Sequence, residues 1–458
     1  MRNKIRAFFV AVLALYGIQA VAQTKKWTLR ECVEYALENN ISVKQSELDL
    51  ELNEISKSDA FGAFLPTANA NASHMWNSGL SQDIISNQNT VQTTMFSSFG
   101  FGTQIDIYKG LQNQAQYRRA KMAIIAGQYQ LQKMKDDIGL NVANAFLQIL
   151  FNRENLKVQQ QQLEADLRQQ ERSKELLEGG LIPQGDLLDV EATVALDRQR
   201  VIAAENQLLI SRLSLAQLLQ LDDFQNFDIA DEDYNKEDSE VLLQTPEAIF
   251  EKAKTIRTEI KLAEANLEVA EQDVKIARAV YQPTLRGFYS LDTRIGYSDV
   301  PKFSEETGQF IGLESPPPFW TQFWDNKGHS FGFQLNIPIL NGFSTRNNVS
   351  RAKVALERSK LAYDQQELDL ERNIYTAFTD AQGALKAYDA AVSAAQARAQ
   401  ALEYAQERYD VGLINVFDLN QAQTLSVNAQ SEVLRTKYDF IFRVKILEFY
   451  FGMPIFQN

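Results

Sequence analysis

The sequence predicts a mixed fold, written twice along the chain, that combines long coiled-coil helices with short pairs of β-strands. Three observations carry this prediction. The stretches "GGLIPQGDLLD" from Gly179 and "VGLINVFDLNQ" from Val411 share five of the eight positions that begin at Gly180 and Gly412. A polar, proline-free run of about 67 residues leads into each stretch. Segments of strict two-residue alternation precede each run.

The first 22 residues are expected to be a secretory signal peptide. "MRNKIR" supplies three positive charges, and "AFFVAVLALYGI" is an apolar run too short to span a bilayer. Ala20 and Ala22 are small residues ahead of a cleavage point. The signal takes three of the 46 basic residues and none of the 59 acidic ones, which leaves 43 against 59, a net charge of −16. That charge argues against nucleic acid as a partner.

Matching blocks in the same order define two structural repeats. "FLPTANANAS" resembles "YQPTLRGFYS", which aligns Pro66 with Pro283, and "RRAKMAI" resembles "SRAKVAL". We therefore expect a first repeat over 23–221, a second over 245–453 and a C-terminal tail over 454–458. The segment 222–244 between the repeats is acidic, because residues 221 to 240 hold nine acidic residues and one lysine. Such a composition is typical of a solvated linker.

Each repeat is expected to contain three helices. The first helix, over about 28–63 or 246–281, ends before a proline. The second, over 111–177 or 344–410, is a rod of roughly 100 Å that must pack beside other rods, as coiled coils do. A glycine, Gly180 or Gly412, ends each rod. The third helix then leaves, over about 184–221 or 416–451, so the repeated stretch is the tip of a helical hairpin.

The strands of each repeat alternate between an apolar and a polar face. Phe331, Phe333 and Leu335 alternate with Gly332 and Gln334. These segments are about ten residues long, which suits a tilted strand that crosses a bilayer. Aromatic residues gather near their ends, as in an interfacial girdle: Trp76, Tyr108, Tyr297, Trp320 and Trp324.

The export signal and the strands together predict a transmembrane β-barrel that is shared between subunits. After the signal, no apolar run of about 18 residues offers a transmembrane helix. Four strands per chain cannot close a barrel, and open edges are not tolerated in lipid. Two copies would supply eight strands, whose side chains fill the interior, whereas three copies would supply twelve and leave a bore. A channel favours a homotrimer.

The order of these blocks resembles the TolC family of outer-membrane efflux proteins over nearly the whole mature chain. The resemblance rests on the duplicated layout, on Pro66 and Pro283, on "FQLNIPILNGF" from Phe333 and on the two tips. It implies a homotrimer whose barrel lies in the outer membrane and whose helices form a periplasmic tunnel. It also implies two partners, a periplasmic adaptor protein and an inner-membrane transporter, for the export of small molecules or peptides. The alternatives are a type I protein secretion channel and a soluble periplasmic coiled-coil scaffold.

The resemblance also implies functional residues at the tips. It places a periplasmic gate at Asp186, Asp189, Tyr409, Asp418 and Gln421. Gln421 stands where the family has a second aspartate, and Ile414 stands where some members have an arginine that locks the tips. The adaptor would contact the six tip residues Gly180, Leu181, Ile182, Gly412, Leu413 and Ile414. For Asp186 and Asp418, the competing interpretation is a carboxylate that stabilises a helix start.

Catalysis is not expected. The two histidines, His74 and His329, lie far apart in the sequence, and there is no nucleophile motif, phosphate loop or metal-ligand spacing. Cys32 is the only cysteine, which excludes an intrachain disulfide and a cysteine metal cluster. The sequence therefore predicts no enzyme, no cofactor and no metal site.

Overall fold

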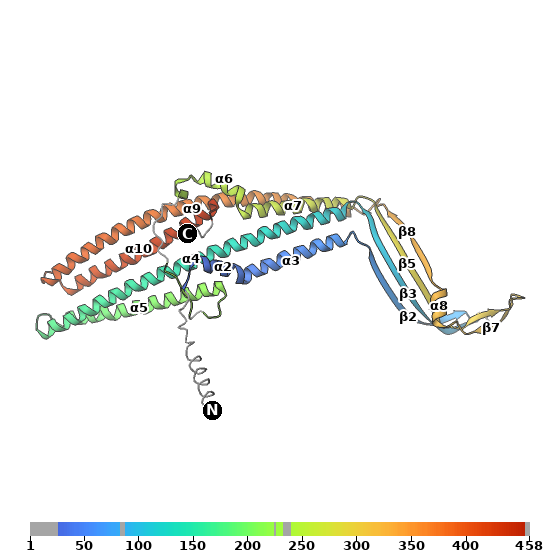
Figure 1. Cartoon of the computed structure of the whole chain (residues 1–458), viewed down its shortest axis with the longest axis horizontal. Helices are drawn as coiled ribbons and strands as arrows, with labels where there is room; N and C mark the ends of the chain where they lie inside the picture. The colour runs from blue at the N-terminus through green and yellow to red at the C-terminus, as the bar shows by residue number, and fades with distance from the viewer. Residues whose placement is uncertain (1–25, 83–87, 224–225, 232–239, 454–458) are drawn as a thin grey trace, which may run out of the picture. The chain divides into compact units, whose positions relative to one another are not determined.

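The computed structural model describes residues 26–82, 88–223, 226–231 and 240–453 (Figure 1). The predicted signal peptide and the C-terminal tail lie outside the described residues. The chain divides into two compact units. We call them the helical unit (residues 1–50, 127–263 and 363–458) and the strand unit (51–126 and 264–362).

The same order of elements occurs in the two halves of the chain. The first half contains α2 (Leu29–Asn39), α3 (Ile41–Gly62), β2 (Thr67–Gln82), β3 (Asn89–Lys109), α4 (Gln112–Glu178) and α5 (Gln184–Leu219). The second contains α6 (Pro246–Ile256), α7 (Thr258–Ala279), β5 (Thr284–Gly296), β8 (Gly328–Asn336), α9 (Ser344–Asp410) and α10 (Val416–Phe451). Three further elements, β6 (Val300–Phe303), β7 (Phe310–Glu314) and α8 (Phe319–Asp325), lie between β5 and β8. Both α4 and α9 have 67 residues, which matches the predicted rods.

The first helix of each half was expected to be continuous, and this was wrong. Asn40 separates α2 from α3 in an extended conformation, with ψ of 132°. Its side chain accepts a hydrogen bond from the Ser42 amide at 2.9 Å and donates one to the Leu218 carbonyl at 3.0 Å. Arg257 interrupts the second half in the same way, between α6 and α7, with ψ of 134°. The Arg257 side chain is buried and donates to the Phe449 carbonyl of α10 at 3.3 Å, so each break residue contacts the end of another helix.

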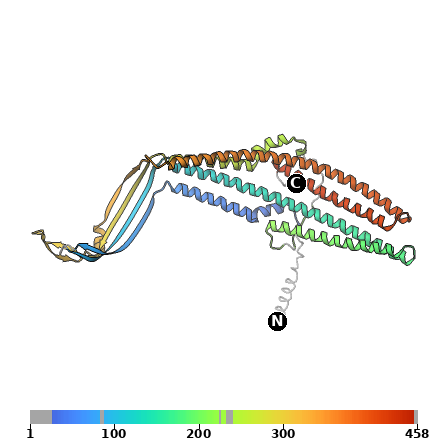
Figure 2. The same ribbon diagram turned by 180° about the vertical axis from the view of Figure 1, so that it is seen from behind.

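Four antiparallel strands form the sheet of the strand unit, in the order β2-β3-β5-β8 (Figures 1 and 2). Two of them are longer than the expected ten residues, because β2 has 16 and β3 has 21. The register gathers apolar side chains on one face, among them Phe99, Phe101, Ile105, Leu285, Leu291, Phe331, Phe333 and Leu335. The opposite face is polar and carries an ion pair between Arg286 and Asp106 at 2.9 Å.

One strand residue lies on the face opposite to that predicted. Tyr108 was expected on the polar face, with Asp106. The register shifts between these two residues, so that Tyr108 pairs with Leu285 of the apolar face. A bulge adds one residue to one strand and so reverses the alternation beyond it.

Apolar side chains of α2, α4, α5 and α10 form the main core of the helical unit. Phe146 and Ile149 of α4 and Leu215 of α5 are completely buried there. A second cluster joins α6, α9 and α10 around Ile249 and Ile374. Because α2 and α6 each contribute a short amphipathic face, the long rods are held together away from their tips.

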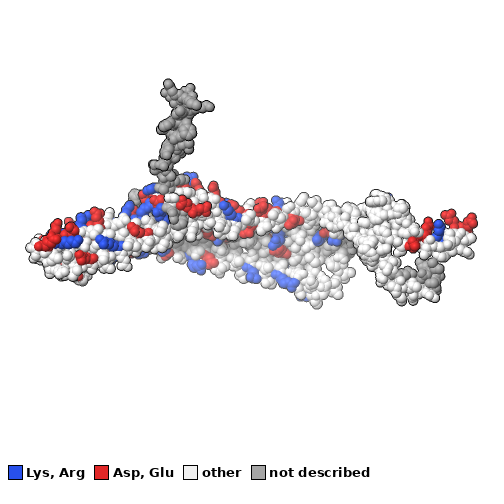
Figure 3. Space-filling model, turned by 90° about the horizontal axis from the view of Figure 1, so that it is seen from below, with Lys and Arg blue, Asp and Glu red and all other residues white. Residues whose placement is uncertain are grey.

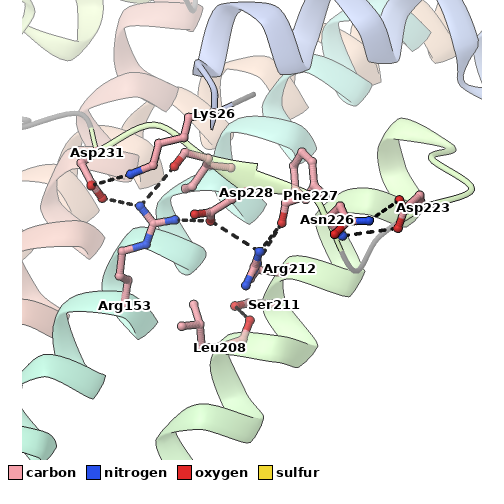
Figure 4. Close-up of polar contacts among 11 residues, drawn as sticks. Lys26, Arg153, Leu208, Ser211, Arg212, Asp223, Asn226, Phe227, Asp228 and Asp231 are labelled. Atoms are coloured by element: carbon pink, nitrogen blue, oxygen red, sulfur yellow. Dashed lines mark hydrogen bonds and ion pairs between the residues drawn. The ribbon is translucent and has the colours of Figure 1, made fainter. Parts of the chain in front are cut away.

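Part of the acidic segment is docked on this core, contrary to the expected solvated linker. Phe227 and Ile229 are buried, and β4 (Asp228–Ile229) pairs in parallel with β1 (Lys26–Trp27). Figure 4 shows Arg153 of α4 bound to Asp228 at 2.6 Å, to Asp231 and to the Ile229 carbonyl. Two side chains of the acidic segment, those of Asp228 and Asp231, are thus partners of Arg153.

No helix in the described part of the chain is both long and apolar enough to cross a membrane.

Candidate functional site

The first hairpin tip ends α4 through a backbone motif that needs Gly180. The amide of Leu181 donates to the Leu176 carbonyl at 2.8 Å, and the amide of Gly180 donates to the Leu177 carbonyl at 2.9 Å. This pair of bonds is the Schellman arrangement, which requires a left-handed residue. Gly180 fulfils it with φ of +71°. The turn leaves the Leu181 side chain 74% exposed at the tip.

The second tip repeats this geometry. Leu413 donates to the Arg408 carbonyl at 2.8 Å, and Gly412 donates to the Tyr409 carbonyl at 2.9 Å, with φ of +74°. Leu413 is 69% exposed. Asn415 then caps α10, because its side chain accepts a hydrogen bond from the Asp418 amide at 2.9 Å. The side chain that caps this helix is therefore that of Asn415, and the Asp418 carboxylate is left for another role.

The three predicted gate carboxylates lie just past the two tips. Asp186 and Asp418 are in the first turns of α5 and α10, where a negative charge is favoured by the helix dipole. Asp189 and Gln421 follow one turn later, and Asp189, Asp418 and Gln421 are exposed. No hydrogen bond or ion pair engages the side chains of Asp186, Asp189 or Asp418 within the described residues.

Tyr409, one of the predicted gate residues, contacts the long helix of the first hairpin. Its hydroxyl accepts a hydrogen bond from Gln169 of α4 at 3.1 Å, and no bond joins it to Asp186 in the described part of the chain. The neighbouring Asp410 pairs with Arg172 of α4 at 2.8 Å. Gln169 and Arg172 were missed by sequence reasoning, although their spacing of three residues on a rod places them on one helix face. Polar contacts thus join the two hairpins near their tips.

A buried pair of carboxyl groups lies further along the first hairpin. Asp166 of α4 and Asp197 of α5 are each only 2% exposed. Burial, and then the neighbouring Asp197 carboxyl, raise the pKa of Asp166 to about 7. Arg200 donates to Asp197 Oδ1 at 2.8 Å, and Gln162 donates to Asp166 Oδ2 at 2.7 Å. Asp197 Oδ2 has no hydrogen-bond partner among the described residues, so it can accept a hydrogen bond from a protonated Asp166.

The apolar face of the sheet is the other surface available for function. Phe331, Phe333 and Leu335 of β8 are 80%, 77% and 61% exposed. Few charged side chains interrupt the sheet on the face of the molecule drawn in Figure 3. An apolar surface of this extent is unusual on a protein that is surrounded by water.

A family model decides the relationship of this chain to known proteins. The model of outer membrane efflux proteins matches residues 32–220 and 249–445. The chain belongs to the outer membrane efflux protein family. The family predicted from the sequence is thereby confirmed, and membership places the chain in the outer membrane.

Individual relatives of this outer membrane efflux protein are distant in sequence. The outer membrane protein TolC of Vibrio cholerae is 24% identical over 317 residues, which cover 67% of this chain and 65% of TolC. The match therefore spans just under two thirds of the length of TolC.

Solved structures show the same fold. The CmeC outer membrane channel of Campylobacter jejuni superposes with a TM-score of 0.75 at 18% identity, over 94% of this chain and 87% of CmeC. A membrane protein of Pseudomonas aeruginosa gives a TM-score of 0.76 at 20% identity, over 93% of each chain. The predicted combination of coiled-coil helices and membrane strands is confirmed by these two likenesses.

Proposed function

We propose that this chain is the outer-membrane channel of a tripartite export system, and that it works as a homotrimer with a periplasmic adaptor and an inner-membrane transporter. The observation that carries the proposal is the four-stranded sheet, which has an exposed apolar face and two outer edges. Family membership supports the role in export, since efflux is the activity after which the family is named.

The edges of the sheet favour assembly. β2 and β8 each have one neighbouring strand in the described part of the chain, so their outer edges have backbone groups without a strand partner. In lipid each such group would cost several kcal/mol, and a closed barrel removes the cost. Three copies would join β8 of one chain to β2 of the next and give twelve strands, enough for an open bore.

Exposed apolar stripes on two helices fit the same seam. On α9, Val354, Leu361 and Leu368 recur every seven residues and are 61%, 66% and 59% exposed. On α3, a second stripe of Ile41, Leu48 and Ile55 has the same spacing and is 55%, 59% and 51% exposed. α3 leads into β2, and α9 follows β8. The two stripes would therefore meet between neighbouring copies as a coiled-coil seam.

The hairpin tips would contact the adaptor. Their exposed apolar side chains, Leu181 and Leu413, stand on turns fixed by Gly180 and Gly412, with Ile182 and Ile414 beside them. Apolar side chains at the end of a hairpin offer a docking surface for a partner protein. The same turns orient both hairpins in the same way, so the adaptor would meet six similar tips in a trimer.

The carboxylates past the tips would form the gate. In a trimer, three copies of Asp418 would converge near the axis, with Gln421 one turn further along α10. Tyr409 lies on the same hairpin as Asp418, whereas Asp186 and Asp189 lie on the other hairpin. Like charges at close range repel one another and attract cations. Because Asn415 supplies the cap of α10, the Asp418 carboxylate is available for this role.

The test is the mass of the purified protein in detergent, followed by its conductance in planar bilayers. We expect a trimer that forms cation-selective channels blocked by multivalent cations. Asp418→Asn should keep the trimer and weaken both selectivity and block, because the Asn415 cap stays intact. Asp189→Asn, the control one turn further along α5, should change them less. A monomer in detergent would refute the channel, and unchanged selectivity in Asp418→Asn would refute the acidic gate.

A further inference from the structure

The segment between β7 and β8 contains a short helix directly after three successive prolines. Residues 315–326 read "SPPPFWTQFWDN", and prolines in a row cannot continue a strand. Pro318 instead stands at the start of α8, with φ of −55°, a value that the proline ring favours. α8 is short, with seven residues, and four of them are aromatic.

Polar contacts fix α8 to one end of β5. Gln322 is 8% exposed, and its side chain both accepts from the Gly296 amide and donates to the Gly296 carbonyl, each at 2.9 Å. The Thr293 hydroxyl donates to the Phe323 carbonyl at 3.0 Å. Asn326, just after α8, donates to the Arg294 carbonyl at 2.7 Å. These four bonds hold α8 in one orientation on the sheet.

The face that α8 covers is the apolar one. The ring of Phe99 on β3 lies 5.8 Å from that of Phe319 and 5.6 Å from that of Phe323. Phe99 is paired with Thr293, and the same face continues through Phe101 and Leu291 toward Phe333. α8 therefore caps one end of the surface that would face lipid in the proposed channel.

Two tryptophans remain on the outer side of α8. Trp320 and Trp324 are four residues apart, hence on one side of the helix, and are 66% and 58% exposed. Trp76, on the same face of β2, is 65% exposed. Tryptophan has an apolar ring and one polar N–H, and it is enriched where a membrane meets water.

The distribution of charge supports a boundary at this level. In Figure 3 the sheet shows few charged side chains, whereas charges return on the β6–β7 hairpin beyond it. That hairpin carries an exposed ion pair of Lys302 with Glu314 at 3.2 Å. Lys327 lies 5.4 Å from the Trp324 ring. α8, which carries the two tryptophans, thus lies between the apolar face of the sheet and a charged, water-exposed hairpin.

We propose that α8 is an interfacial anchor that inserts Trp320 and Trp324 into the headgroup zone of the outer membrane. The partner is membrane lipid, because the surface is continuous with the lipid-facing side of the sheet. This inference rests on the proposed channel, which requires that side to face lipid. Its role is to fix how deeply the sheet sits in the bilayer at the end where α8 is attached.

The test is quenching of tryptophan fluorescence by brominated lipid. The full chain with Trp27→Phe and Trp76→Phe keeps only the two tryptophans of α8, since the chain has four in all. It is reconstituted in phosphatidylcholine vesicles with bromine either at a shallow or at a deep acyl position. The reference chain has all four tryptophans replaced by Phe and carries Phe333→Trp. We expect the fluorescence of the two α8 tryptophans to be quenched at least twofold more by shallow bromine than by deep bromine. The fluorescence of the Phe333→Trp reference chain should be quenched more by deep bromine than by shallow bromine.

Each other result contradicts a definite part of the proposal. In one such result, neither bromolipid quenches the α8 tryptophans, water-soluble acrylamide quenches them fully, and the tryptophan of Phe333→Trp is quenched by lipid. The sheet then spans the bilayer, but α8 is not an anchor. Deep quenching of α8 would likewise refute a headgroup position. If neither chain is quenched, the channel and the anchor both fail. Should Trp27→Phe not fold, Trp320→Ser with Trp324→Ser in the otherwise unchanged chain gives a second test, in which shallow quenching should fall by about half or more.

Discussion

Replacing Asp166 with asparagine is expected to remove a pH dependence from the stability of the helical unit. The carboxyls of Asp166 and Asp197 share a site in which both residues are 2% exposed. Arg200 binds Asp197, whereas the hydrogen-bond donor to Asp166 is the neutral Gln162. The proton of the pair therefore belongs on Asp166, where it can be donated to the open Asp197 Oδ2.

Helix α10 contributes polar but uncharged side chains near Asp166 and Asp197. Asn420 of α10 donates to Thr193 of α5 at 3.0 Å, and the two helices start from adjacent tips in the same direction. Gln423 and Ser426 lie three and six residues after Asn420, which brings them to the level of Asp197. Both are buried. An ionised Asp166 would thus face one carboxylate, already paired with Arg200, and neutral side chains.

The size of the effect follows from the pKa of Asp166, raised from 3.8 to about 7. At about 1.4 kcal/mol per pKa unit, this rise corresponds to about 4 kcal/mol. Below about pH 4 the carboxyl is protonated in both the folded and the unfolded chain, so the group has no effect on the free energy of unfolding. As the pH rises toward 7 the unfolded chain ionises first, and stability falls until the folded carboxyl also ionises.

The measurement is thermal unfolding of the trimer in detergent, followed by circular dichroism between pH 4 and pH 8.5. Asp166→Asn should match the unmodified protein at pH 4 and exceed it at pH 8 by about 4 °C in Tm. Glu164→Gln is the matched control, because Glu164 lies on the same turn but its side chain is 70% exposed. It should change the pH profile little. A profile for Asp166→Asn parallel to that of the unmodified chain would refute a shared proton.

Two further predictions concern the sheet and the tips. Phe333→Arg should cost about 2–4 kcal/mol near the bilayer midplane and lower the yield of membrane-inserted trimer, whereas Gln334→Arg should be tolerated. Equal losses in the two variants would contradict a membrane-spanning β8. Gly412→Ala should lower stability by about 1 kcal/mol, because φ is +74° and a Cβ there meets no atom within 4 Å. Gly383→Ala, inside α9 and equally uncrowded, should raise stability by up to about 1 kcal/mol, so a loss of stability in both variants would speak against the backbone argument.

Much of the fold was predictable because it depends on local signals. The absence of proline and the terminal glycines set the ends of α4 and α9 to within one residue or two. Strand facing was equally predictable wherever the two-residue period held. The repeat boundaries between 221 and 245 stay a prediction, although Phe227 and Ile229 show that this segment is more than a linker.

Long-range contacts account for what the sequence did not predict. The helix breaks at Asn40 and Arg257 depend on partners such as Leu218 and Phe449, roughly 180 or more positions away. α8 depends on Gln322 finding both backbone groups of Gly296. In each case a polar side chain binds backbone groups of another element, and the periodicity of the local sequence does not record such a contact.

The carboxyl pair is different, because the sequence did contain its signal. On α5 the buried positions Val190, Val194, Asp197, Val201 and Ala204 follow a heptad spacing of four and three. An aspartate in such a seam either has a partner or remains neutral, since an isolated buried charge is too costly. α4 shows the same break, with Asp166, Gln169 and Ser173 at seam spacing and all buried. Two polar breaks in the two arms of one hairpin, at nearly the same distance from its tip, come to the same level when the hairpin closes. Asp166 lies 14 residues before Gly180 and Asp197 lies 13 residues after Gln184, so the sequence brings the two carboxyl groups together inside the hairpin.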